Sequence, residues 1–382
     1  MAVTKEELVD RARSLAPKIA AAASGAEAER KPNDEVIRLL KEAGVFGVLV
    51  PKRWGGPELG LDAQQELVET VSAACMSTGW ITCFYTGHNA FASRFSEQAQ
   101  KDVFANGPVC LMPATTNSLM DVKKVAGGWE ISGRATWGSG IMHADWVLVG
   151  GDSEDGRHVF LVPASDAGFD DVWFMSGMSG TGSNDIVIEK AFVPQHRGML
   201  MDIFMEGNSE GGLIHNNPVY TMPLMPFIYS EISGVFNGGL KGALDAFDAT
   251  IRKRVITHSG DAVRERPHNH IQLGAAATAS IIADELARGI MRDATYGSLH
   301  GMNLEDRLRL KAKTGFFVDH CRHAVNAMIN RAGATSFRSD AALQRFFRDI
   351  NTVAIHAFWD WEVSYEQFGR HRLGLEPNNP LI

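Results

Sequence analysis

Cysteine is scarce in this chain of 382 residues, which has only four: Cys75, Cys83, Cys110 and Cys321. None forms a C-x-x-C pair or has metal-ligand spacing, so the pattern favours reduced, buried thiols in a cytoplasmic protein over a disulfide framework. No run of about 18 apolar residues is present, so no helix is expected to cross a membrane. The opening segment has Glu6, Glu7 and Asp10 where a signal peptide needs an apolar core.

Positive charge is in deficit, because 37 Lys and Arg residues stand against 45 Asp and Glu residues, a formal net charge of -8. An acidic surface repels phosphate backbones, and no nucleic-acid partner is expected. Thirteen histidines are present, but His268 and His270 have no Asp, Glu or Cys at ligand spacing. The sequence therefore predicts no metal site.

Common cofactor and nucleophile signatures are also missing. Gly138-Ser-Gly140 and Gly180-Thr-Gly182 lack the third glycine of a G-x-G-x-x-G turn, which disfavours a dinucleotide-binding Rossmann unit. One G-x-S-x-G occurs, at 207–211, but it lies in a polar loop rather than at a strand-to-helix elbow. Neither pattern indicates the chemistry of this protein.

The patterning that is present changes twice along the chain. Helical spacing predicts four helices in the first third, with Thr4 and Glu7 as a capping box. Their ranges are Lys5–Glu29, 32–44, Asp62–Met76 and Thr78–Phe95. Short apolar runs from about Pro108 to Arg197 predict a β-domain. Four longer helical patterns predict an antiparallel bundle, at Glu231–Thr257, His270–His300, Leu304–Arg331 and Ser339–Phe368. We expect domains at 1–107, 108–206 and 207–382.

Several short motifs follow one another in a recognisable order. They are Gly133-Arg-Ala-Thr-Trp-Gly-Ser139, His143-Ala-Asp-Trp146, Arg348-Asp349, His356 with Asp360, and His371-Arg-Leu-Gly374-Leu375. On this layout they resemble the acyl-CoA dehydrogenase superfamily over nearly the whole chain. The resemblance implies an α+β, mostly α fold. It has an N-terminal helical domain, a middle β-barrel domain and a C-terminal four-helix bundle.

One departure separates this chain from the dehydrogenases of that superfamily. Many of them carry a catalytic Glu in a Tyr-Glu-Gly-Thr segment, where this chain has Ala357 after His356. Removing an α-proton from a thioester needs a positioned carboxylate. The motif Ser-Gly-x-x-His-x-x-Trp at 139–146 and the late His371-x-x-Gly-Leu resemble instead the oxygenase components of two-component aromatic monooxygenases, the group D flavin monooxygenases.

The resemblance implies a cofactor, a reaction and a set of site residues. Reduced FMN or FAD comes from a separate NAD(P)H:flavin reductase, and O2 adds to it as a C4a-hydroperoxide that hydroxylates a small phenolic or indole-like aromatic compound. The resemblance also implies that His88, Ser139 and His371 are the catalytic residues. Cofactor binding falls to Trp137, Ser139, Gly140, Ser183, Arg264 and Arg348, with Arg254 and Arg266 as alternatives to Arg264. The expected pocket lining is Trp80, Phe84, Tyr85 and Met222. A homotetramer is expected on the same ground.

Other interpretations stay open at this point. An acyl-CoA dehydrogenase, a nitrogen- or sulfur-oxygenating relative and a helical scaffold without flavin are the rival functions. His88 could be a hydrogen-bonded core histidine, and His371 a surface residue in a polar tail. The expected pocket residues Trp80, Phe84, Tyr85 and Met222 could be plain core.

Overall fold

The first segment of the computed structural model, which describes residues 3–255, 260 and 262–382, is helical. Its helices are α1 (Lys5–Glu29), α2 (Asp34–Glu42), α3 (Leu61–Ala74), α4 (Met76–Ala92) and α5 (Glu97–Val103). The predicted capping box is confirmed: Thr4 Oγ1 accepts from the Glu7 amide, and Glu7 accepts from the Thr4 amide. This reciprocal pair fixes the start of α1 at the predicted residue.

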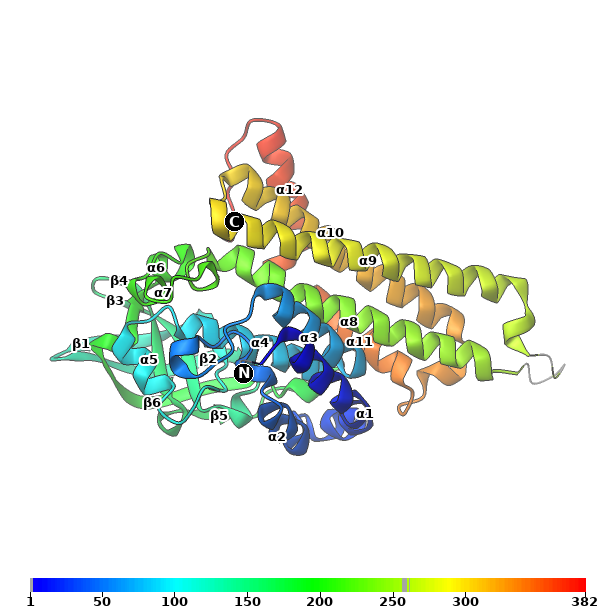
Figure 1. The fold of residues 1–382 in the computed structure, drawn as a ribbon, viewed down its shortest axis with the longest axis horizontal. Helices are drawn as coiled ribbons and strands as arrows, with labels where there is room; N and C mark the ends of the chain where they lie inside the picture. The colour runs from blue at the N-terminus through cyan, green and yellow to red at the C-terminus, as the bar shows by residue number, and fades with distance from the viewer. Residues whose placement is uncertain (1–2, 256–259, 261) are drawn as a thin grey trace.

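A single mixed sheet of seven strands follows (Figure 1). The strands are β1 (Ala114–Val125), β2 (Gly128–Gly138), β3 (Trp146–Ser153), β4 (Gly156–Pro163), β5 (Gly168–Asp170), β6 (Asn184–Pro194) and β7 (Gly198–Leu200). Their order is β5-β6-β2-β1-β3-β4-β7, and only β1 and β3 run parallel. β4 also approaches β6, so the sheet curls around its own apolar core, which includes Ile131, Val149 and Phe160.

The last segment is again helical. Its helices are α6 (Met201–Glu206), α7 (Glu210–Leu213), α8 (Leu224–Lys253), α9 (Pro267–His300), α10 (Leu304–Ala332), α11 (Ala342–Ala354) and α12 (Trp361–Arg372). Residues 256 and 257 of the predicted range Glu231–Thr257 lie outside the described residues. In the described part of the chain no helix is long and apolar enough to cross a bilayer.

The prediction of one helix over Ser339–Phe368 is wrong. The chain leaves helical geometry after Ala354 and makes the short 3-10 turn η10 (Ala357–Trp359) before α12 begins. Side chains stabilise the break: His356 accepts from the Phe358 amide and Asp360 accepts from the Val363 amide. Amphipathic spacing continues through the break, so periodicity alone could not reveal it.

The first and last segments share one core, because α3 packs closely along α8. Gly234, Gly238 and Gly242 form a stripe at i, i+4 and i+8 on α8 that faces this contact. A Cβ at Gly234 would lie 2.7 Å from the Gln65 carbonyl oxygen. Glycine therefore permits the close approach, and the predicted division into three domains stays a prediction.

Candidate functional site

A directed line of hydrogen bonds, here called the hydroxyl line, runs from Trp80 of α4 through Ser139 and Ser183 to Thr181 and so joins α4 to the sheet. Trp80 Nε1 donates to Ser139 Oγ at 3.0 Å, and Ser139 Oγ lies 2.8 Å from Ser183 Oγ. Ser183 Oγ lies 2.7 Å from Thr181 Oγ1, whose proton goes to the Met178 carbonyl at 2.8 Å. Because each hydroxyl has one proton, Ser183 must donate to Thr181 and Ser139 to Ser183. One lone pair of Ser139 is left to accept from an N–H group.

Trp137 occupies an irregular position in β2, where the register with β6 shifts. Its φ is +63°, and its amide donates to Asp185 Oδ1 at 3.1 Å. A bulge re-aims a side chain, and left-handed backbone at a non-glycine residue concentrates at functional sites. Here the indole is turned outward and is 61% exposed, and its ring meets Trp173 edge-on with centroids 5.9 Å apart.

These two features fit a planar heteroaromatic cofactor such as a flavin. An open indole face offers a stacking surface, and Trp173, which contacts it, lies in a segment with other exposed apolar side chains: Phe169, Val172, Phe174 and Met175. A reduced flavin carries an N–H at its ring edge, which matches the acceptor lone pair of Ser139. The donor and acceptor count of the hydroxyl line is therefore compatible with the expected cofactor.

One face of α4 is a continuous row of rings. Trp80, Phe84, His88 and Phe91 lie at helical spacing, which brings side chains three and four residues apart together. Ring centroids are 4.5 Å apart for Trp80 and Phe84, 5.1 Å for Phe84 and His88, and 5.1 Å for His88 and Phe91. This row, the aromatic face of α4, begins at the residue that holds Ser139.

His88 lies in the middle of the aromatic face and is buried. Its Nδ1 is 2.6 Å from the Met112 carbonyl oxygen, which can only accept, so Nδ1 carries the proton. Burial lowers the pKa of His88 to about 4, against the weaker raising effect of that hydrogen bond. At neutral pH the ring is therefore uncharged, with Nε2 as an acceptor.

Two further rings, from η10, pack against the start of the aromatic face of α4. The sequence motifs did not predict a site role for either of them. His356 stacks on Trp359 with centroids 4.5 Å apart, and Trp359 meets Trp80 edge-on at 5.8 Å. Trp359 Nε1 donates to the Val353 carbonyl at 3.0 Å, and burial lowers the pKa of His356 to about 4. The position of His356 in the family-like motif was the available signal, but its contact with α4 depends on the unpredicted helix break.

Tyr85 points away from the aromatic face. Its ring meets Phe46 edge-on at 5.4 Å, and its hydroxyl donates to the Gly140 carbonyl at 2.6 Å. Burial raises the pKa of Tyr85 above its usual range. Gly140 has φ +82°, and a Cβ there would lie 2.5 Å from the Tyr85 hydroxyl, so only glycine fits. These two residues fix α4 against the sheet, while Met222 is buried in the helical core before α8.

Arg348 lies on α11 and is engaged within the chain. Its guanidinium pairs with Glu27 of α1 and donates to the Ser176 carbonyl and to Gln344. The next residue, Asp349, accepts from the Met178 amide at 2.5 Å, and so joins α11 to the end of the hydroxyl line.

Two predicted residues lie apart from the rest within one subunit. Arg264 pairs with Glu265 in the 3-10 turn η8 (Val263–Glu265), at the end of the α8–α9 pair that is remote from the sheet (Figure 1). His371 is near the end of α12, which projects away from α4 at the top of Figure 1. The roles of both residues stay predictions.

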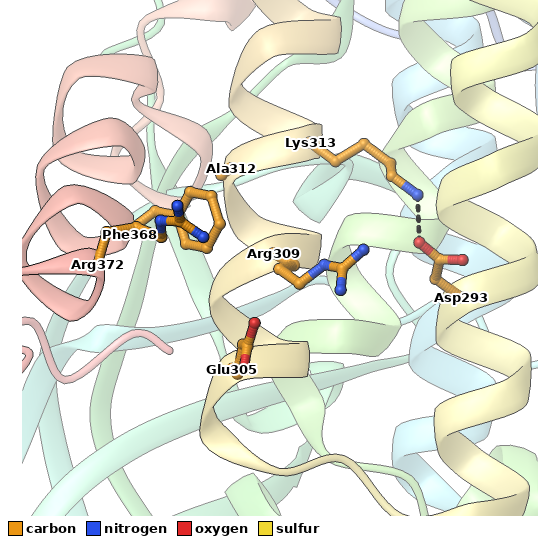
Figure 2. A pocket seen from close by; sticks show the side chains of 7 residues that line it. All are labelled: Asp293, Glu305, Arg309, Ala312, Lys313, Phe368 and Arg372. Atoms are coloured by element: carbon orange, nitrogen blue, oxygen red, sulfur yellow. Dashed lines mark hydrogen bonds and ion pairs between the residues drawn. The ribbon is translucent and has the colours of Figure 1, made fainter.

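A surface pocket of about 390 Å³ lies between α9, α10 and α12 (Figure 2). Its lining is Asp293, Glu305, Arg309, Ala312, Lys313, Phe368 and Arg372. Lys313 pairs with Asp293, and none of the predicted site residues lines the pocket. Charged, paired side chains suit a solvated groove better than an aromatic substrate. The described residues also contain no group of three His, Cys, Asp or Glu that could hold a metal ion.

Comparisons with known proteins give one consistent answer. Family models for the acyl-CoA dehydrogenase N-terminal and C-terminal domains match residues 3–107 and 232–361. A pigment production hydroxylase from Rhodococcus sp. is 38% identical, with 100% of both chains aligned. HsaA, an oxygenase subunit of a flavin-dependent monooxygenase from Mycobacterium tuberculosis, is 31% identical over 97% of this chain and 96% of its own. The solved structure of XiaF from Streptomyces sp. with FADH2 and glycerol has a TM-score of 0.90, 26% identity and coverage of 99% and 98%.

Proposed function

This chain belongs to the acyl-CoA dehydrogenase family, among its flavin-dependent monooxygenases, and from that premise we propose that it hydroxylates a small phenolic or indole-like compound. One observation carries the proposal: Trp80 belongs both to the aromatic face of α4 and to the hydroxyl line. A cofactor at Ser139 and a flat substrate against Phe84 and His88 would thus share a boundary at this indole.

Reduced FAD or FMN, delivered by a separate reductase, supplies the oxygen-activating chemistry when bound. Ser139 would accept from the N–H at the cofactor's ring edge, with its orientation fixed by Ser183, which takes its proton. Trp137 would offer its open indole face to the ring. Arg348 and Arg264 are the candidates for the cofactor's phosphates, with Arg264 coming from a neighbouring subunit.

His88 orients the substrate. Its neutral Nε2 accepts a hydrogen bond from a phenol O–H or an indole N–H, which raises the electron density of the ring to be hydroxylated. Phe84 and Trp80 exclude water from the reacting ring. His371 is a second candidate for this task and would reach the pocket from another subunit.

We also propose a homotetramer in the cytoplasm. On α9, Ile271 is 73% exposed and Ile281 65% exposed, and exposed apolar side chains gathered along one helix mark an interaction surface. All four cysteines are free and buried, which suits a reducing compartment.

The test mixes the protein and reduced FMN or FAD, prepared without oxygen, with oxygenated buffer and a panel of phenols and indoles. We expect a hydroxylated product from at least one class, with little free peroxide. The variant Trp80→Phe keeps the ring but removes the donor to Ser139, so it should release more peroxide per flavin oxidised. Trp129→Phe is the matched control, because Trp129 lies in the sheet core. Oxidation of an acyl-CoA thioester without any aromatic product would contradict the proposal.

A further inference from the structure

The aromatic face of α4 ends on a buried cation. Arg94 follows one turn after Phe91 and is 0% exposed. Its guanidinium carbon lies 5.4 Å from the Phe91 ring centroid, 5.7 Å from that of Phe204 and 5.9 Å from that of Phe227. A single ring, Phe91, therefore separates this guanidinium from His88.

Arg94 uses only one edge of its guanidinium within the chain. Nη1 donates to the Phe204 carbonyl at 2.9 Å. Among the described residues, Nε and Nη2 have no hydrogen-bond partner, and no carboxylate forms an ion pair with this arginine. Nε and Nη2 are the two parallel donors with which an arginine binds a carboxylate side-on.

Glu231 is a buried acid whose charge acts on Arg94, but the described residues show no ion pair between the two side chains. It is 1% exposed on α8, where Oε2 accepts from Gln64 Nε2 at 3.3 Å and Oε1 has no partner among the described residues. Burial raises the pKa of Glu231 well above its usual value, an effect that exceeds the lowering by Gln64, by the charge of Arg94 and by Cys83. Burial also lowers the pKa of Arg94, to about 9, so both groups are held in a medium that disfavours their charged forms.

We propose that Arg94 and Glu231 form a subsite for the carboxylate of an aromatic acid, which the free Nε–Nη2 edge of Arg94 binds side-on. The proposal rests on the function proposed above and narrows its substrate class to phenols or indoles with an acidic side chain. The acid lies beyond Phe91, and the ring to be hydroxylated lies toward His88. A carboxylate supplies the negative charge that the buried arginine lacks, which a water molecule cannot do. In its protonated form, Glu231 would donate a further hydrogen bond to it.

The test compares acids with neutral analogues of matched length. Isothermal titration measures the dissociation constants of para-hydroxybenzoate, para-hydroxyphenylacetate and para-hydroxyphenylpropionate against the corresponding para-alkylphenols. One acid should bind at least about 10-fold more tightly than its analogue, since charge-assisted pairs of this kind are the strong ones. Arg94→Met should weaken that acid about 10- to 100-fold and leave the alkylphenol nearly unchanged. Arg94→Lys should give an intermediate loss, and Glu231→Gln only a small one.

The outcomes separate the two proposals. If wild-type protein hydroxylates neutral phenols and binds the acids no more tightly, the subsite is wrong and the proposed function stands. If it oxygenates neither acids nor neutral compounds, the proposed function is wrong. The wild-type comparison needs no variant, so misfolding of Arg94→Met would leave the subsite testable.

Discussion

At the residue in the middle of the aromatic face, burial decides the protonation state. The pKa of His88 is lowered to about 4, so the ring stays neutral through the range in which a solvated histidine titrates. The profile of kcat/KM against pH should therefore show no limb near pH 6.5 from this residue. Its acid limb should lie near pH 4.

Replacing His88 tests the same assignment. His88→Asn should lower kcat/KM about 100-fold, since a positioned acid–base or hydrogen-bonding group contributes at least that much. The matched control is His158→Asn, because His158 is also buried but lies in the sheet against Trp129. Equal losses in both variants would mean that His88 has only a structural role.

A second buried group sets a pH dependence of stability. Burial raises the pKa of Asp349 to about 6, against the lowering effect of the Met178 amide. Between about pH 4 and pH 6 the folded state binds more protons at this carboxyl than the unfolded state, so its contribution is lost as the pH rises. Asp349→Asn keeps the acceptor oxygen and removes the charge.

The free energy of unfolding of Asp349→Asn should therefore exceed that of the wild type by about 1–3 kcal/mol at pH 7. The gain should shrink at pH 5, as measured by urea unfolding at both values. A variant less stable than the wild type at pH 7 would show that the ionised carboxylate is needed by Met178 and the neighbouring arginines.

At the scale of elements, the glycine stripe on α8 decides how closely α3 can approach. A Cβ at Gly238 would meet the Glu69 carbonyl, whereas nothing lies within 4 Å of a Cβ at Gly274 on α9. Gly238→Ala should destabilise the fold by about 1–3 kcal/mol through overpacking. Gly274→Ala should instead stabilise it by about 0.5–1 kcal/mol. Urea unfolding midpoints that move in the same direction for both variants would refute this account.

Local chemistry explains which element boundaries were predictable. The helix over Lys5–Glu29 was predicted at its observed bounds, because Thr4 and Glu7 encode the cap in four residues. The break after Ala354 was missed because amphipathic spacing continues through it and because its local caps act together with a tertiary contact: Trp359 packs on Trp80, far away in the sequence. Side chains at i and i+4 of one helix can be placed together from sequence, whereas pairs across the fold cannot.

The candidate site, too, could be predicted from the sequence only where its residues lie close together in the chain. Trp80, Phe84 and His88 share a helix face by spacing alone, so their proximity followed from the sequence. Nothing local indicated that Tyr85 faces the core or that Ser139 accepts from Trp80. Arg94 looked like an ordinary residue at a helix end, because its burial depends on Phe204 and Phe227 from later segments.

The surface of the whole molecule carries the last prediction. One face of α9 packs into the bundle, but four large apolar side chains of this helix are exposed: Ile271, Ile281, Ile282 and Tyr296. Exposed apolar surface of this extent favours self-association through the bundle. Light scattering after size exclusion should give four times the 41.7 kDa of one chain.

The variant Ile281→Glu tests whether this surface holds the subunits together. It should shift the mass downward, and it should weaken flavin binding if Arg264 and His371 act across the interface. Lys18→Glu, on α1, is the charge-changing control and should leave the mass unchanged. A wild-type monomer that retains full activity would exclude any role for a second subunit and would leave the roles of Arg264 and His371 without support.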